Sequence, residues 1–155
     1  VRCGRVFKEI NAMKKSFFLL PLLLAVLVLL SACGASVPDA EKTLTESLLS
    51  AISEEDFAAA AELLDSESGL AETTIRSYIY ALEAETDCDF SSGARVVDYT
   101  AYEDYTDESS PEEQRTLHKL RADIKVGTMP FTLMVITVAE DTGVSVYNFA
   151  FELKN

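Results

Sequence analysis

Residues 116–126 read TLHKLRADIKV, and charged side chains alternate along this run with apolar ones. A period of two residues predicts a β-strand that has one buried face and one solvated face. The buried face would carry His118, Leu120, Ala122, Ile124 and Val126. Such a strand needs other elements to cover its apolar side, and the neighbouring sequence supplies them.

Two more strands are expected after this one. Residues 131–139 are almost wholly apolar, as is typical of a central strand, and residues 144–153 alternate again. The second of these runs would place Tyr147, Phe149, Phe151 and Leu153 on one side. Short turns at residues 127–130 and 140–143 join the three runs, so we expect an antiparallel meander.

A fourth strand is expected over residues 95–104, and it is followed by a charged turn at residues 106–113. Three tyrosines lie in or near this strand. On a regular strand Tyr99 and Tyr105 share one face, and Tyr102 lies on the other.

Three short amphipathic helical patterns precede the strands. The first covers residues 40–52, with Ser36 and Asp39 as a capping pair. The second is expected to start with Ser53 as its N-cap, and the third covers residues 71–82. Helices followed by antiparallel strands indicate the α+β class, with N-terminal helices packed on one face of a curved sheet of about four strands.

Residues 13–33, MKKSFFLLPLLLAVLVLLSAC, differ from the helix and strand patterns of the rest of the chain and carry a targeting pattern. Two lysines precede an apolar run at 17–30, and a small pair of side chains precedes Cys33. The run spans about 21 Å as a helix, which is short of the roughly 30 Å hydrocarbon core of a bilayer. The pattern therefore predicts a bacterial lipoprotein signal, removed at residue 32, whether translation starts at Val1 or at Met13.

Processing at this site sets the expected domain organisation. Residues 1–32 would be removed, residues 33–38 would form the lipid anchor and tether, and residues 39–155 would form one α+β domain. Cys33 would carry fatty acyl chains such as palmitate. The tether reaches at most some 15–20 Å, so we expect a domain held close to the extracytoplasmic face of the cell membrane.

The charge of the chain excludes some partners. The whole sequence has a formal net charge of −13, and loss of the signal removes five basic side chains and one acidic one, which leaves −17. Such an acidic domain opposes binding to nucleic acid and to anionic lipid head groups. The membrane is thus expected as a partner through the lipid on Cys33 alone.

Cysteines and acidic clusters give no sign of a cofactor or a metal. Once Cys3 is removed and Cys33 is acylated, Cys88 has no disulfide partner in the chain, and we interpret it as a small buried side chain. The acidic runs lack the spacing of a calcium loop, and the sequence has neither a phosphate-binding glycine loop nor a Gly-x-Ser-x-Gly motif. We expect no cofactor and no metal.

Residues 48–65, LLSAISEEDFAAAAELLD, combine a polar break, an acidic–aromatic pair and an alanine-rich helix. With the lipobox before them and the strands at 116–126, 131–139 and 144–153 after them, they make the chain similar to a known family. It resembles small bacterial lipoproteins that carry a cone-shaped domain of the nuclear-transport-factor-two-like, or cystatin-like, kind. The resemblance implies a cone-like sheet and no particular activity. A homodimer that pairs through the two sheets remains an open alternative.

Relatives on that fold include isomerases and dehydratases that hold a small apolar ligand in the cone. Such chemistry needs a histidine or carboxylate that projects into the cavity. His118, the single histidine, is in register with the apolar face, and Asp98 is the nearest candidate for its carboxylate partner. A hydrogen-bonded structural histidine explains the same pattern, so no catalytic residue is assigned.

Three functions stay open from the sequence. We favour a non-enzymatic binding or accessory domain that uses its concave sheet for a protein, a peptide or a small ligand. The first alternative is an isomerase or hydratase, with His118 or Asp98 as the general base. The second is a structural subunit of an envelope complex.

Overall fold

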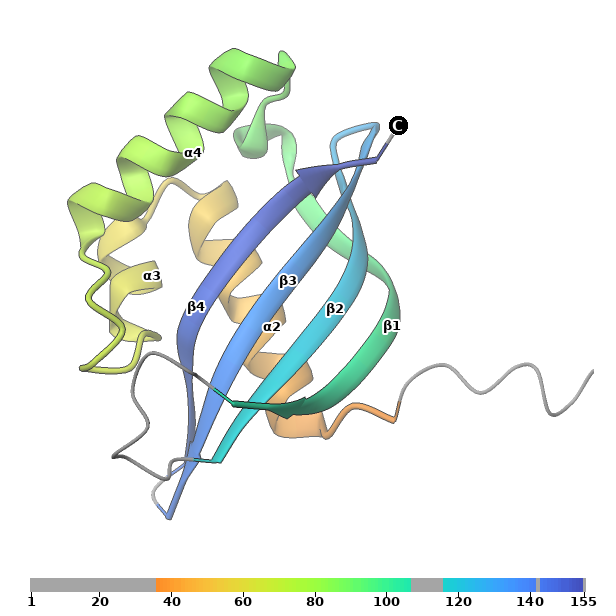
Figure 1. The fold of residues 1–155 in the computed structure, drawn as a ribbon. Helices are drawn as coiled ribbons and strands as arrows, with labels where there is room; N and C mark the ends of the chain where they lie inside the picture. Colours follow the sequence, from red (N-terminus) through yellow and green to blue (C-terminus); the bar gives the residue numbers. More distant parts are fainter. Residues whose placement is uncertain (1–35, 107–115, 142, 155) are drawn as a thin grey trace, which may run out of the picture. The chain divides into compact units, whose positions relative to one another are not determined.

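The computed structural model describes residues 36–106, 116–141 and 143–154, which belong to one compact unit, Gly34–Asn155 (Figure 1). Three α-helices and one short 3-10 helix precede four strands, so the predicted α+β class is confirmed. The lipobox with Cys33 and most of the charged turn at 106–113 lie outside the described residues. The elements are α2 (Asp39–Ser53), α3 (Phe57–Glu62), α4 (Glu72–Thr86), η1 (Phe90–Ser92), β1 (Ala94–Tyr105), β2 (Thr116–Val126), β3 (Met129–Glu140) and β4 (Gly143–Leu153).

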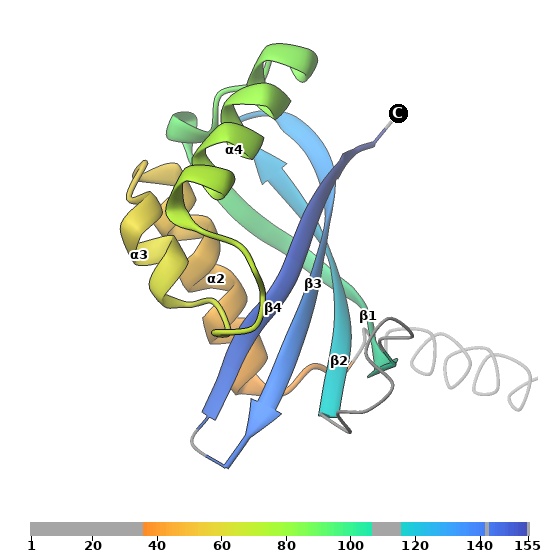
Figure 2. The same cartoon turned by 60° about the vertical axis from the view of Figure 1, so that its left-hand side comes forward.

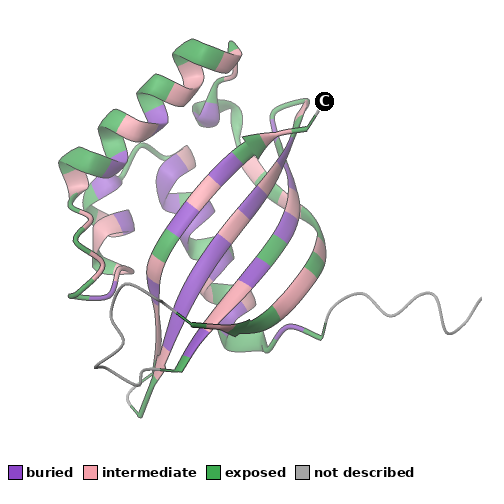
Figure 3. Ribbon diagram, in the orientation of Figure 1, coloured by how far each residue is buried: buried purple, intermediate pink, exposed green. Residues whose placement is uncertain are grey.

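The four strands form one antiparallel sheet in the order β1-β2-β3-β4, which confirms the predicted meander. Along β2, Leu120, Ala122, Ile124 and Val126 are all buried, as the alternation predicts (Figure 3). Gly127 begins the turn to β3 with a φ of 57°, a conformation that favours glycine. A Cβ atom there would lie 2.7 Å from the Ser92 hydroxyl oxygen.

Two irregularities in β1 change which tyrosines share a face. The pairing of β1 with β2 shifts between Val96 and Asp98 and again between Tyr99 and Ala101. A bulge inserts a residue and so reverses the alternation beyond it. Tyr99 and Tyr102 therefore both pack against the main core, and Tyr105 packs against a second cluster. The expectation that Tyr99 and Tyr105 share a face is wrong.

A third irregularity lies in β4. The pairing with β3 shifts between Ile136 and Thr137, so Val146 faces the main core. Tyr147 packs instead against the second cluster, formed by Leu117, Ile136 and Val138. The prediction that Tyr147 shares a face with Phe149 and Phe151 is wrong for this reason, whereas both phenylalanines lie in the core as expected.

The three α-helices lie on one side of the sheet (Figure 2). Helix α2 contacts both edge strands, β1 and β4, which requires the sheet to curve around it. Its residues Leu48, Leu49 and Ile52 are fully buried between helix and sheet. The concave, helix-facing side of the sheet is therefore filled by packed side chains.

The ends of the helices differ from the predicted caps. Pro38 is the N-cap residue of α2 and makes no side-chain cap hydrogen bond, so the capping pair of Ser36 and Asp39 is not formed. Helix α3 is capped by Asp56, whose carboxylate accepts a hydrogen bond from the Ala59 N–H. Ser53 lies at the end of α2, where its hydroxyl accepts a hydrogen bond of 2.9 Å from the Ala94 N–H. That bond joins the end of α2 to the start of β1.

Candidate functional site

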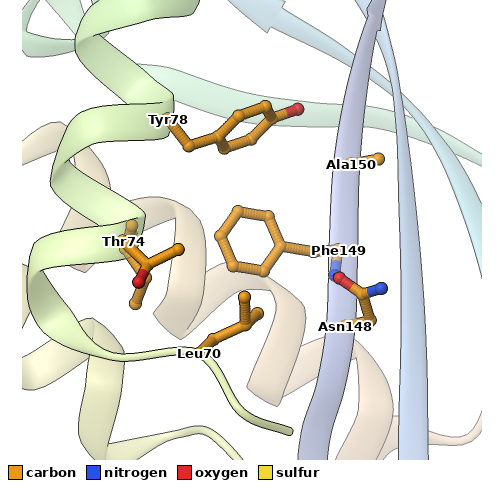
Figure 4. Close-up of a pocket in the computed structure, with 7 residues that line it drawn as sticks. Leu70, Thr74, Tyr78, Asn148, Phe149 and Ala150 are labelled. Atoms are coloured by element: carbon orange, nitrogen blue, oxygen red, sulfur yellow. The ribbon is translucent and has the colours of Figure 1, made fainter.

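A pocket of about 250 Å³ lies between α4 and the outer edge of β4 (Figure 4). β4 is an edge strand, and among the described residues the only β-pairing on its outer side is an isolated bridge between Leu64 and Val146. Helix α4 buries Ile75 and Ile79 against the core and turns its next row of side chains toward this edge. The lining residues are Leu70, Thr74, Ile75, Tyr78, Asn148, Phe149 and Ala150.

Aromatic rings form much of the pocket wall. The ring of Phe149 extends from β4 toward α4 and lies between Tyr78 and Leu70 (Figure 4). Its centroid is 6.0 Å from that of Tyr78, at an interplanar angle of 66°. Thr74 and Tyr78 are four residues apart on α4, and residues at this spacing lie on one side of a helix. Leu70 lies just before the helix begins.

Hydrogen bonds close the β4 edge on both sides of the pocket. At one end, the Val146 N–H donates to the Leu63 carbonyl at 2.9 Å and the Val146 carbonyl accepts from the Asp65 N–H at 2.7 Å. At the other end, the Phe151 N–H donates to the Tyr78 hydroxyl oxygen at 2.9 Å. Between them, the Phe149 N–H donates only to the side-chain oxygen of its exposed neighbour Asn148, at 2.8 Å.

The pocket lining is uncharged. Its seven residues include no carboxylate, histidine, lysine, arginine or cysteine. The polar groups are the hydroxyls of Thr74 and Tyr78 and the amide of Asn148. The Tyr78 oxygen accepts from Phe151, and within residues 36–106, 116–141 and 143–154 no acceptor is bonded to its hydrogen. Such a lining can bind and orient a molecule, but it offers no general acid–base pair.

A second polar cluster lies where α2 begins, against β1 and β2. Glu41 is 4% exposed, and its carboxylate accepts a hydrogen bond of 2.9 Å from the Tyr102 hydroxyl. The same oxygen is 3.9 Å from Nδ1 of His118, whose ring lies 5.1 Å from that of Tyr102. That Nδ1 is buried and has no hydrogen-bond partner among the described residues. On the other side of the ring, Nε2 is 3.7 Å from the exposed carboxylate of Asp104.

The environment of this cluster changes the acidity of its tyrosines. Burial raises the pKa of Tyr102 well above its usual value, and the hydrogen bond and charge of Glu41, with the charge of Asp104, raise it further. Burial also raises the pKa of nearby Tyr99 to about 12, with the charge and hydrogen bond of Glu46 as additional causes. These effects keep both hydroxyls protonated. The bond from Tyr102 to Glu41 joins the first turn of α2 to β1.

The structure brings His118 to a carboxylate, but not to Asp98. His118 lies on the helix-facing side of β2, as its register predicts, and pairs with Asp104 across the sheet. Asp98 is exposed and pairs with Asp123, beyond the bulge at Val97, so the expected pairing of His118 with Asp98 is wrong. Glu41 was missed, although it lies on the same helical face as Thr45 and Leu48, where an acidic side chain is unusual.

The structure also places Cys88, which the sequence led us to interpret as a small buried side chain. Cys88 is half-buried, packs against the core and is a free thiol. In the described ranges, no group of three or more His, Cys, Asp or Glu side chains could hold a metal ion. Likewise, no helix in them is both long enough and apolar enough to span a bilayer.

Comparison of the chain with protein-family models, with curated proteins and with solved structures found no match.

Proposed function

We propose that this protein is a lipoprotein, anchored through Cys33 to the extracytoplasmic face of the cell membrane, whose domain binds a small apolar ligand without converting it. The lipobox supports the location. The uncharged apolar pocket between α4 and β4 supports binding, and it is the observation that carries the proposal. The lining has no carboxylate, histidine, lysine or cysteine that could form an acid–base pair, which favours binding over catalysis.

This proposal moves the binding surface away from the concave face of the sheet. Helix α2 covers that face, and Leu48, Leu120 and Val135 in this layer are completely buried. A ligand would have to displace a helix to reach them. The edge of β4 offers an opening that needs no such rearrangement, so we place the ligand there. We also propose that the curved sheet around α2 is cone-like, in the manner of cystatin-like domains.

Fluorescence titration tests the binding proposal. The probe is N-phenyl-1-naphthylamine, an uncharged aromatic dye, and the sample is a soluble form that starts at Gly34, because Gly34–Asn155 is a compact unit with its own core. We expect saturable binding that Thr74→Trp weakens at least tenfold by filling the pocket. Thr73→Trp is the matched control, since Thr73 is exposed on the same helix and does not line the pocket. Equal binding by both variants would refute the proposal.

The cluster of Glu41, Tyr102 and His118 keeps an isomerase or hydratase as a second candidate. A buried carboxylate lies 3.9 Å from an unpaired imidazole nitrogen, so a shift of about 1 Å would bring the two groups within the hydrogen-bond distance that proton transfer needs. The cluster lies on α2, β1 and β2, whereas the pocket lies at the opposite edge of the sheet. Mass spectrometry of a recovered natural ligand separates the two candidates: binding predicts an unchanged molecule, whereas an enzyme predicts a product that His118→Gln abolishes.

A further inference from the structure

We infer that the ligand of this pocket is an uncharged molecule the size of one substituted aromatic ring that carries a hydrogen-bond acceptor. This inference rests on the proposed function and specifies its ligand. It follows from the size of the pocket, its closed ends, its aromatic wall and the donors at its edge.

The size of the pocket limits the ligand to about one ring. Its volume of about 250 Å³ lies below the roughly 300–1,000 Å³ of pockets for drug-sized ligands. An engineered apolar cavity of about 150 Å³ in another protein holds one benzene molecule. A ring with a small substituent fits between these limits.

The closed ends of the pocket favour a small molecule over a peptide. A peptide strand that added to β4 would need the outward-facing groups of successive residues along the edge. Leu63 and Asp65 already occupy those of Val146, and Tyr78 occupies the N–H of Phe151. Between these bonds lie the outward-facing groups of Phe149 alone, and its N–H donates to the side chain of its neighbour Asn148. This stretch is too short for strand pairing and long enough for one hydrogen bond.

Two donors at the pocket favour a ligand with an acceptor. The Phe149 N–H is bonded to the side chain of exposed Asn148, which can rotate into water when a ligand oxygen takes its place. The Tyr78 hydroxyl accepts from Phe151 and still has its own hydrogen to donate. A carbonyl oxygen has two lone pairs and can accept from both groups.

The surroundings of the pocket disfavour an ion. No lining side chain carries a charge that could compensate a buried ammonium or carboxylate, and burial of an unpaired ion is costly. The net charge of −17 after signal removal adds repulsion for anions. The rings of Tyr78 and Phe149, 6.0 Å apart, provide edge and face contacts for an aromatic ligand.

Three ring compounds of similar size test the inference by NMR titration of the soluble form: acetophenone, which has a carbonyl acceptor; cumene, its apolar isostere; and benzoate, its charged analogue. One net hydrogen bond corresponds to a preference of about 2- to 12-fold, so we expect acetophenone to bind more tightly than cumene by that factor. Benzoate should bind more weakly than both. Tyr78→Phe leaves only the Phe149 N–H as a donor and should reduce the preference for acetophenone, whereas Tyr80→Phe, which changes an exposed tyrosine of the same helix, should leave it unchanged.

The outcomes separate this inference from the proposed function. Equal affinities for acetophenone and cumene, or the tightest binding by benzoate, would overturn the inference while the binding proposal stands. Binding of the naphthylamine dye without binding of any single-ring compound would overturn it in the same way. If neither the dye nor any ring compound binds, the proposed function fails as well.

Discussion

Replacement of Tyr102 by phenylalanine tests whether the cluster at the start of α2 is structural. The change removes the hydroxyl that donates to Glu41 at 2.9 Å and leaves a carboxylate that is only 4% exposed without this bond. A hydrogen bond to a charged group contributes about 1.5–3 kcal/mol, and we expect Tyr102→Phe to lower the free energy of unfolding by this amount. The assay is urea denaturation at pH 7, with the midpoint followed by circular dichroism.

The double variant makes the test specific. Exchange of both partners for apolar groups of similar shape can be nearly neutral. The free energy of unfolding of the variant that combines Glu41→Leu with Tyr102→Phe should therefore lie within about 1 kcal/mol of the wild-type value. This margin includes the effect of losing an acidic side chain from the first turn of α2. If the double variant lost as much stability as the sum of the two single variants, the two groups would not act as a pair and the reasoning would be refuted.

The pair formed by Tyr99 and Glu46 is the matched control. It has the same chemistry and joins the same two elements, but its hydrogen bond is 3.4 Å long and Glu46 is exposed. Tyr99→Phe should change the free energy of unfolding by less than about 0.5 kcal/mol. The variants of the Tyr102 pair should also bind the naphthylamine dye with unchanged affinity, because the pocket lies at the other edge of the sheet.

Three further predictions concern pH, a turn and the anchor. The pKa of Tyr102 is raised in the folded state, so at high pH the folded protein keeps a proton that the unfolded chain loses. The free energy of unfolding should therefore fall as the pH rises above about 10. Tyr102→Phe should make that fall less steep in denaturation curves measured at several pH values. Gly127→Ala should destabilise the domain more than Gly69→Ala in thermal melts. Both glycines have positive φ, but only the Cβ at residue 127 would meet Ser92; equal losses would contradict this account. Cys33→Ser should abolish metabolic labelling by an alkynyl fatty acid, and retained label would refute the anchor.

The regular parts of the fold could be predicted because local patterns determine them. The alternation in residues 116–126 predicted the buried face of β2, since a one-residue shift would expose all of it. The β-bulges could not be predicted in this way. A single extra residue at 100 or at 147 changes the faces beyond it, and its position depends on how the neighbouring strand pairs. The faces of Tyr102 and Tyr147 were misassigned for this reason.

The candidate site was harder to predict because its parts are distant in the sequence. Burial of Glu41 is acceptable only because Tyr102, from a strand 61 residues later, donates to it. The pocket likewise needs Tyr78 of α4 beside Phe149 of β4, and nothing local to either residue indicates that contact. Periodicity did place Tyr78 on the apolar face of its helix and Phe149 on that of its strand. How the two elements meet is a property of the tertiary packing.

Backbone amide chemical shifts test the binding claim most directly. A ¹⁵N-labelled soluble form is titrated with acetophenone, and the account predicts that the largest changes map to Thr74, Tyr78 and Phe149 around the pocket. Largest changes around Glu41 and His118 instead, with the pocket amides unmoved, would contradict it.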